Sequence, residues 1–172
     1  EKIYHLCIPT TFGSGSESTS FAVLYKNKLK YSISHNSILP DDVILNHKYT
    51  IGLNGKVSYC SIIDSFCQSI ESLWSVNKTN QSIDFAFKAI SLLKVPLTRI
   101  TELSDSDREK LLLASHYSGK AINISKTTGP HAFSYYLTLN HNLCHGEAVS
   151  ILFEEFIEEN FVSIREKDQF KL

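Results

Sequence analysis

Three side chains that bind divalent metals in many enzymes, Asp64, His131 and His145, carry the strongest chemical signal in this sequence. One carboxylate and two imidazoles can hold an ion while leaving a coordination position open for water or substrate. Such an ion acts as a Lewis acid on a carbonyl or alkoxide oxygen. Because the three residues lie far apart in the sequence, their spacing alone leaves open that they are unrelated packed or surface side chains. His141, four residues before His145, either faces the same cavity or lies in a loop.

A run of small residues from Pro9 to Glu17 offers a second kind of site, a contact with a phosphate or a ribose. Glycine allows the backbone to approach a ligand closely, which makes Gly13 a candidate cofactor-binding residue. An ordinary loop explains the run equally well, because it matches neither the dinucleotide-binding nor the P-loop glycine motif.

Composition limits the classes of protein to which the chain can belong. The 172 residues fit one domain or parts of two, and 42% hydrophobic and 20% charged residues are typical of a globular chain. The net charge of −1 gives no electrostatic signature of a nucleic-acid partner or an anionic membrane. No apolar run approaches the roughly 18–20 residues of a membrane span. We therefore expect no nucleic acid, no membrane and a cytoplasmic location.

The cysteines are scattered along the sequence and form no CxxC motif. In a chain of this size, the pattern predicts buried or free thiols in a reducing compartment rather than a framework of disulfides. The residues concerned are Cys7, Cys60, Cys67 and Cys144.

The elements that must position the candidate residues change from strands to helices near residue 55. The first part predicts a buried strand at 3–8, a hairpin of strands at 21–25 and 30–34, and a short strand at 43–45. Apolar residues then recur with the helical period, which predicts helices at about 58–73, 80–94, 104–118, 120–138 and 146–162.

Local signals mark the ends of two of these helices. Asn80 or Ser82 is expected to cap the second helix, and Ser104 with Asp107 resembles a capping box at the start of the third. Gly119 is expected to end that third helix.

Five blocks of sequence resemble, in the same order and with fitting separations, segments of the iron-containing (group III) alcohol dehydrogenases. The blocks are Pro9–Glu17 (against the family's PTTxGTGSE), Leu39–Leu45, Ile63–Glu71, Gly129–Ala132 and Cys144–Gly146. The resemblance implies an α/β plus all-α architecture, the dehydroquinate synthase-like fold of that family. Residues 1–54 would be the C-terminal part of an α/β nucleotide-binding domain, and residues 55–172 a helical metal-binding domain.

The same resemblance implies roles for particular residues. The aspartate and the two histidines named first would bind Fe²⁺ or Zn²⁺. The nicotinamide cofactor, NAD(P)H, would lie along Thr10, Thr11 and Lys30, with the two threonines near its ribose and phosphates.

Two positions depart from the family pattern. Gln68 stands four residues after Asp64, on the same face of the expected helix, where the family usually has a fourth metal ligand, a histidine. An amide oxygen is a weaker ligand, so Gln68 binds the ion loosely, binds it through water or leaves a three-ligand site. Tyr135 stands where many members have a histidine beside the nicotinamide, and it is either a proton donor or a packing residue. His141 is the other candidate for proton transfer.

Three further segments narrow the resemblance to the phosphonoacetaldehyde reductases of phosphonate biosynthesis: 70–79, 119–128 and 131–138. Those enzymes reduce phosphonoacetaldehyde to 2-hydroxyethylphosphonate. Lys120, Lys126, Thr127 and Thr128 supply cations and hydroxyl donors close in sequence to His131, and the last three are the candidate contacts for a phosphonate. The alternative is a solvated lysine beside capping threonines.

We therefore expect a metal-dependent, NAD(P)H-linked alcohol dehydrogenase or aldehyde reductase that acts on a small-molecule aldehyde or alcohol, and a homodimer is one assembly that it allows. Members of the family are longer and carry a glycine-rich loop upstream of the Pro9 block, so the sequence is expected to be the middle to C-terminal part of such an enzyme. Two alternatives stay open. One is a dehydroquinate-synthase-like lyase, although that group favours glutamate as its first ligand, and the other is a non-catalytic fragment or degenerate homologue.

Overall fold

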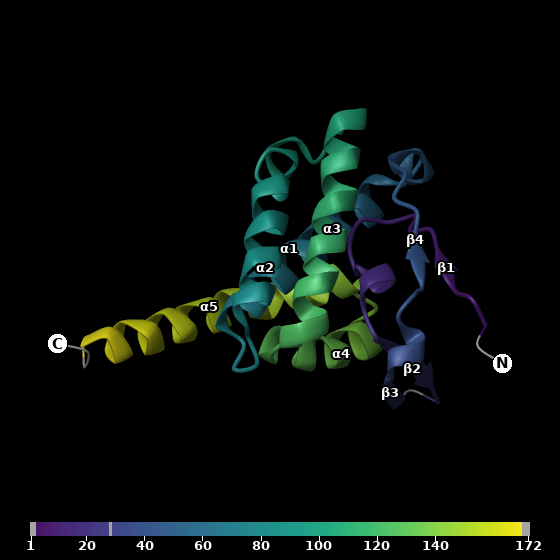
Figure 1. Cartoon of the computed structure of the whole chain (residues 1–172). Coiled ribbons are helices and arrows are strands. Elements are labelled where there is room, and N and C mark those ends of the chain that lie inside the picture. Colours follow the sequence, from purple (N-terminus) through teal and green to yellow (C-terminus); the bar gives the residue numbers. More distant parts are fainter. Residues whose placement is uncertain (1–2, 28, 170–172) are drawn as a thin grey trace.

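The computed structural model describes residues 3–27 and 29–169, with side chains up to residue 160. The strands lie on one side of the molecule and the helices on the other (Figure 1). Strands β1 (Leu6–Cys7) and β4 (Asp42–Val43) pair in parallel, and β2 (Phe21–Lys26) and β3 (Leu29–Ser34) form an antiparallel hairpin.

The predicted hairpin is confirmed, whereas the predicted buried strand at 3–8 is both shorter and more exposed than expected. Only Leu6 and Cys7 form ladder pairs, and the side chain of Leu6 is 46% exposed. The reason is that β1 has only β4 as a strand neighbour among the described residues.

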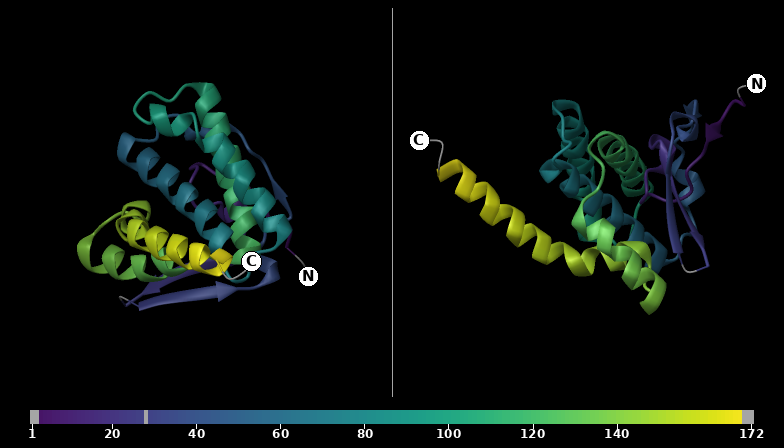
Figure 2. Two further views of the ribbon diagram at one scale, coloured as in Figure 1. Left: turned by 90° about the vertical axis from the view of Figure 1, so that its left-hand side faces the viewer. Right: turned by 90° about the horizontal axis from the view of Figure 1, so that it is seen from below.

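The helix α1 lies at the centre of the helical part, where it packs against α2, α3 and α5. The helices are α1 (Gly55–Trp74), α2 (Asn80–Leu93), α3 (Asp105–Ser125), α4 (Gly129–His141) and α5 (His145–Gln169). Short 3₁₀ helices occur at Ser16–Ser18, Asn36–Ile38, His47–Thr50 and Pro96–Arg99. Figures 1 and 2 show that α5 packs beside α4 at its start and projects beyond the other helices at its end. None of the helices in the described residues has an apolar stretch long enough to cross a membrane.

Side-chain caps fix where α2 and α3 begin. The Thr79 hydroxyl accepts a hydrogen bond from the Ser82 N–H at 3.2 Å, and the Ser82 hydroxyl accepts one from the Thr79 N–H at 2.9 Å. The cap predicted at Asn80 or Ser82 is therefore wrong, because Thr79 is the cap and Ser82 completes its capping box. The capping box predicted at Ser104 and Asp107 is confirmed.

The helix α3 continues past Gly119, so its predicted end at this glycine is wrong. A Cβ on Gly119 would lie 2.4 Å from the backbone oxygen of Gly15, and Gly15 itself has a φ of +56°. The two glycines therefore allow the loop of small residues to rest directly on α3. The chain turns instead at Lys126, whose φ is 62°, and this turn divides the predicted helix at 120–138 between α3 and α4.

Two groups of buried apolar residues hold the helices together. One lies where the small-residue loop meets α1, α2 and α3, and it consists of Phe12, Ile62, Leu93, Leu111 and Ala114. The other lies between α1 and α5, and it consists of Cys67, Val149 and Phe153. Two sides of α1 are thus covered by apolar contacts, while Asp64, Gln68 and Glu71 give it a third, polar and equally buried face.

A disulfide joins Cys60 of α1 to Cys144, the residue that precedes α5. The prediction of thiols is therefore wrong for this pair, while Cys7 and Cys67 are free. The bonded cysteines are 84 residues apart in the sequence, and their Cα atoms are 6.6 Å apart in the fold. Only the packing of α1 against the start of α5 brings them together, so no local spacing could have indicated the bond.

Candidate metal centre

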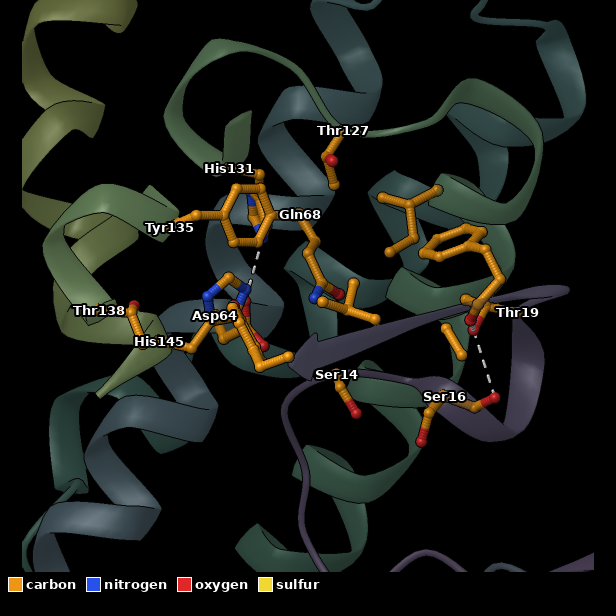
Figure 3. Close-up of a pocket in the computed structure, with 15 residues that line it drawn as sticks. Ser14, Ser16, Thr19, Asp64, Gln68, Thr127, His131, Tyr135, Thr138 and His145 are labelled. Carbon is orange, nitrogen blue, oxygen red and sulfur yellow. Dashed lines mark hydrogen bonds and ion pairs between the residues drawn. The ribbon is translucent and has the colours of Figure 1, made fainter. Parts of the chain in front are cut away.

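Asp64, His131 and His145 meet where α1, α4 and α5 converge (Figure 3). Asp64 lies in the middle of α1, His131 lies in the first turn of α4, and His145 is the first residue of α5. One ligand atom from each residue lies within 4.8 Å of the other two. The Nε2 atoms of His131 and His145 are 3.1 Å and 3.7 Å from Oδ1 of Asp64. An ion that sits about 2 Å from each atom fits this spacing.

Glu71 orients His131 from behind. It lies seven residues after Asp64 on the same polar face of α1, and its carboxylate is fully buried. Nδ1 of His131 donates to one carboxylate oxygen, and the Thr128 N–H and hydroxyl donate to the other. The Trp74 indole N–H donates to the same hydroxyl at 2.8 Å. With Nδ1 bonded to Glu71, His131 points Nε2 towards Asp64 and His145, and a partner of this kind commonly orients a metal-binding histidine.

Sequence reasoning did not assign a role to Glu71. The signal was present, because Asp64, Gln68 and Glu71 follow one another at intervals of four and three residues and so share one face of a helix. What could not be read from this spacing is that α4 places a histidine against the third of these residues.

The electrostatic environments of the two histidines differ. Burial alone would lower the pKa of His131, but the hydrogen bonds to Asp64 and Glu71 and the charges of both carboxylates outweigh it and raise the pKa to about 9. For His145, burial is the largest effect and lowers the pKa, and the positive charges of His131 and Lys30 act in the same direction. His145 is thus the imidazole that more readily offers a lone pair to an ion.

Gln68, the predicted fourth ligand, lies one turn along α1 from Asp64. Its Oε1 accepts a hydrogen bond from the Ser118 hydroxyl of α3 at 2.8 Å, and both side chains are buried. Figure 3 shows its amide ending in the pocket beside Asp64. Binding of a metal by Gln68 stays a prediction.

The three candidate ligands open into a pocket of about 460 Å³. Gln68, Thr127 and Tyr135 also line it, together with residues of the small-residue loop and of β2. An adjoining cavity of about 500 Å³ is bounded by β2, β3 and the turn between α3 and α4. Thr127 and Tyr135 line both spaces, so the two cavities meet at these residues.

Tyr135 lies between the candidate ligands and the hairpin. Its ring stacks on that of His145 with centroids 6.1 Å apart, and Nζ of Lys30 lies 2.9 Å from the centre of the Tyr135 ring. Burial, followed by the proximity of Tyr25, Asp64 and Glu71, raises the pKa of Tyr135 to about 12. The phenol therefore keeps its proton near neutral pH. Burial also lowers the pKa of Lys30.

The small-residue loop reaches the pocket through residues that sequence reasoning did not select. Ser14 and Ser16 line it, as does Thr19. By contrast, the predicted cofactor contacts Thr10 and Thr11 do not line either described cavity.

The third predicted contact in this loop, Gly13, is buried against α1. A Cβ there would lie 2.9 Å from Cα of Ser61. The structure thus shows that Gly13 allows the loop to pack closely against α1, a role that the prediction of a cofactor contact did not include.

The residues predicted to bind a phosphonate lie in the turn between α3 and α4, and their surroundings differ. Lys126 donates from Nζ to the Asn123 carbonyl at 3.1 Å, and Nζ is 4.7 Å from the centre of the Phe21 ring. Thr127 lines both cavities. Thr128 lines the adjoining cavity with its hydroxyl already bonded to Glu71.

His141 is not brought to the pocket. It ends α4, is exposed, and faces the Tyr136 ring at a centroid distance of 5.9 Å. The next residue, Asn142, has a φ of 53° and breaks the helix before α5 begins at His145. Because the two histidines lie on different helices, their spacing of four residues does not place them on one face.

Comparison with models of protein families shows to which family the chain belongs. Residues 59–170 match the family model described as "Fe-containing alcohol dehydrogenase family, C-terminal", and residues 1–47 match that described as "Iron-containing alcohol dehydrogenase". The chain belongs to the iron-containing alcohol dehydrogenase family. The predicted family and fold are confirmed, and the candidate metal centre lies within the segment that matches the family's C-terminal part.

Individual relatives of the chain include a reductase and an alcohol dehydrogenase. The chain is 32% identical to a phosphonoacetaldehyde reductase of Streptomyces viridochromogenes over 90% of its own length and 40% of that protein. It is 29% identical to long-chain-alcohol dehydrogenase 1 of Geobacillus thermodenitrificans over 86% of its own length and 38% of that protein.

Solved structures of two enzymes superpose closely on the chain. Sulfoacetaldehyde reductase of Bifidobacterium kashiwanohense in complex with NAD⁺ aligns with a TM-score of 0.82 and 30% identity, over 90% of this chain and 42% of that one. An iron-containing alcohol dehydrogenase of Thermotoga maritima aligns with a TM-score of 0.81 and 27% identity, over 86% and 41%. The chain thus spans about two fifths of the length of the relatives that it matches.

Proposed function

We propose that this chain provides the metal-binding part of an NAD(P)H-linked alcohol dehydrogenase or aldehyde reductase. The observation that carries the proposal is the convergence of Asp64, His131 and His145 within 4.8 Å, with Glu71 fixing one imidazole from behind. The donor set suits a divalent ion, because it combines one carboxylate with two imidazoles and has a pocket on its open side. Family membership speaks against the lyase alternative.

Fe²⁺ or Zn²⁺ held by these three residues would supply Lewis-acid polarisation of a carbonyl oxygen, and a nicotinamide would supply the hydride. The chain's own residues would position the reactants around that chemistry. Ser14, Ser16 and Thr19 offer hydroxyls along the loop side of the pocket. The predicted cofactor contacts Thr10, Thr11, Gly13 and Lys30 remain part of the proposal.

Tyr135 is the proposed proton donor. It lines the pocket and stacks on His145, and with a pKa of about 12 its phenol carries a proton at neutral pH, as an ordinary tyrosine also does. Nζ of Lys30 lies 2.9 Å from the centre of its ring and so restricts its position. His141 has no part in the proposal, because it lies outside the pocket lining.

The proposed substrate is phosphonoacetaldehyde, reduced to 2-hydroxyethylphosphonate, and it is supported by the similarity to the Streptomyces viridochromogenes enzyme. Lys126, which lines the adjoining cavity, and Thr127, which lines both cavities, are the proposed contacts of the phosphonate, and Thr128 acts with them by fixing this turn to Glu71. A role in phosphonate biosynthesis, a cytoplasmic location and a homodimeric assembly complete the proposal.

The metal centre is tested by elemental analysis of the purified full-length protein after anaerobic loading with Fe²⁺ or Zn²⁺. A near-stoichiometric ion is expected in the wild type and in the matched control Asp84→Ala/His5→Ala, whose residues are exposed and lie outside the site. The ion should be lost in Asp64→Ala/His145→Ala. Absence of metal from the loaded wild type would contradict the proposal and favour a degenerate homologue.

The reaction is tested by following nicotinamide absorbance with phosphonoacetaldehyde, sulfoacetaldehyde and propanal, each with NADH and with NADPH. A preference for phosphonoacetaldehyde supports the full proposal. Activity with propanal alone would keep the reductase and reject the phosphonate substrate.

A further inference from the structure

Gln68 offers two hydrogen-bond donors to the pocket. Its Oε1 is bonded to the Ser118 hydroxyl at 2.8 Å, whereas its Nε2 has no partner among the described residues. Fully buried side-chain atoms that lack a hydrogen-bond partner do occur in the described part of the chain, but Nε2 of Gln68 is not one of them. The amide nitrogen is therefore accessible, and the space that it adjoins is the pocket that Gln68 lines (Figure 3).

This orientation determines what the amide can bind. A carboxamide nitrogen carries two protons and offers no lone pair to a metal ion, but it donates well to an anionic oxygen. Ser118 is completely buried on α3, and its hydroxyl holds the carbonyl end of the amide. The amide nitrogen therefore faces the pocket, where it can donate to an oxyanion but cannot bind a metal ion.

The helical spacing between Asp64 and Gln68 suits a short substrate. Gln68 follows Asp64 by one helical turn, which corresponds to a rise of roughly 5–6 Å. A two-carbon aldehyde that places its carbonyl oxygen at Asp64, His131 and His145 can therefore direct an anionic group on its second carbon towards the Gln68 amide. The chemistry shared by such ligands is a tetrahedral oxyanion, either a phosphonate or a sulfonate.

We propose that Gln68, held by Ser118, is a specificity residue that donates its amide N–H₂ to the oxyanion of a two-carbon aldehyde, and that it is not a metal ligand. The inference rests on the proposed metal-dependent reductase and names a recognition group within it. It also gives a physical reason for an amide at a position where an imidazole would close the coordination shell.

The test measures metal affinity and ligand affinity separately in the full-length protein. Zn²⁺ affinity is measured by competition with a chromophoric chelator. Binding of 2-hydroxyethylphosphonate, 2-hydroxyethanesulfonate and 1-propanol to the Zn²⁺-loaded protein is measured by titration calorimetry. Gln68→Ala is compared with Gln81→Ala, which removes an exposed amide from α2.

Gln68→Ala is expected to keep Zn²⁺ affinity within about twofold and to weaken binding of the anionic alcohols about tenfold or more, as loss of a hydrogen bond to a charged group predicts. Binding of 1-propanol should not change. A loss confined to the phosphonate, or shared with the sulfonate, supports the proposal in either case and identifies the oxyanion. In turnover, Gln68→Ala should raise the KM for the anionic aldehyde more than the KM for propanal.

Two results would overturn the inference. Loss of Zn²⁺ affinity in Gln68→Ala would show that the amide oxygen binds the ion, and unchanged affinity for both anionic alcohols would show that the amide does not contact the oxyanion. Absence of Zn²⁺ from the wild type itself would instead reject the proposed metal centre.

Gln68→His should raise Zn²⁺ affinity and weaken anion binding. If Gln68→Ala does not fold, Ser118→Ala provides the same comparison, with a smaller loss of anion affinity and unchanged Zn²⁺ affinity expected.

Discussion

Glu71 accepts a hydrogen bond from Nδ1 of His131, and both side chains are buried. The two residues come from α1 and α4 and are 60 positions apart in the sequence. Thr128, at the start of α4, donates to the other oxygen of the same carboxylate. Glu71 thereby fixes the position of α4 and the direction of its histidine at once.

Glu71→Gln should lower the affinity for Zn²⁺ by about tenfold to a hundredfold, the range usual for partners of metal-binding histidines. The variant keeps the size of the side chain but removes the negative charge that favours the Nδ1–H form. Chelator competition measures the change, with Glu102→Gln, an exposed glutamate before α3, as the matched control. Equal affinities in the two variants would mean that the carboxylate is only structural.

Gly119→Ala should destabilise the protein by about 1–3 kcal/mol, the usual range for overpacking a filled site. A Cβ at this position would lie 2.4 Å from the Gly15 oxygen, so the small-residue loop would have to move away from α3. Denaturant unfolding measures the effect. Gly55→Ala is the control, because no atom lies within 4 Å of a Cβ at Gly55. A neutral Gly119→Ala would show that the loop does not rest on α3 in solution.

The Cys60–Cys144 bond should be detectable by counting thiols. In denaturant without reductant, a thiol reagent should modify Cys7 and Cys67 alone, and after reduction it should modify all four cysteines of the sequence. Cys60→Ser/Cys144→Ser should lower the stability of the oxidised protein by about 2–4 kcal/mol, as expected when a crosslink that closes a long loop is lost. Cys7→Ser should have no comparable effect. Reaction of all four thiols before reduction would exclude the bond.

Acid should weaken the start of α3. Hydrogen bonds from the Ser104 hydroxyl and N–H lower the pKa of Asp107 below its ordinary value of 3.8. A carboxyl whose pKa is lower in the folded state contributes stability that is present above pH 3.8 and is lost as the pH falls through the folded pKa. Asp107→Asn should therefore destabilise at pH 7, by about 1 kcal/mol as for other capping changes, and much less at pH 2–3. Unfolding curves of both proteins across this pH range provide the measurement, and an equal difference at both ends would contradict it.

Local sequence signals predicted local structure well. Ser104 and Asp107 supply all the groups of a capping box within four residues, and that prediction is confirmed. The two strands of the hairpin are joined by a short turn, so their pairing is also set by nearby residues, and that prediction is confirmed too. The helix end predicted at Gly119 is wrong because this glycine lacks a side chain for a different reason: it packs against Gly15, which is distant in sequence.

The candidate site shows the same division between local and distant information. The family resemblance selected Asp64, His131 and His145, and the structure brings them together. It could not show that Asn142 ends α4 and so places His141 on a different helix from His145. Nor could it show the partner of Gln68, because Ser118 reaches that residue from another helix.

The Cys60–Cys144 disulfide has a further consequence for the candidate metal centre. It closes a ring of backbone that contains α2, α3 and α4. Val76, in the connection that follows α1, is 98% exposed and is open to a protease. One cut there would leave Asp64 on one piece and His131 with His145 on the other, yet the two pieces would remain one covalent molecule. The connectivity of the candidate metal centre therefore does not depend on an unbroken peptide chain.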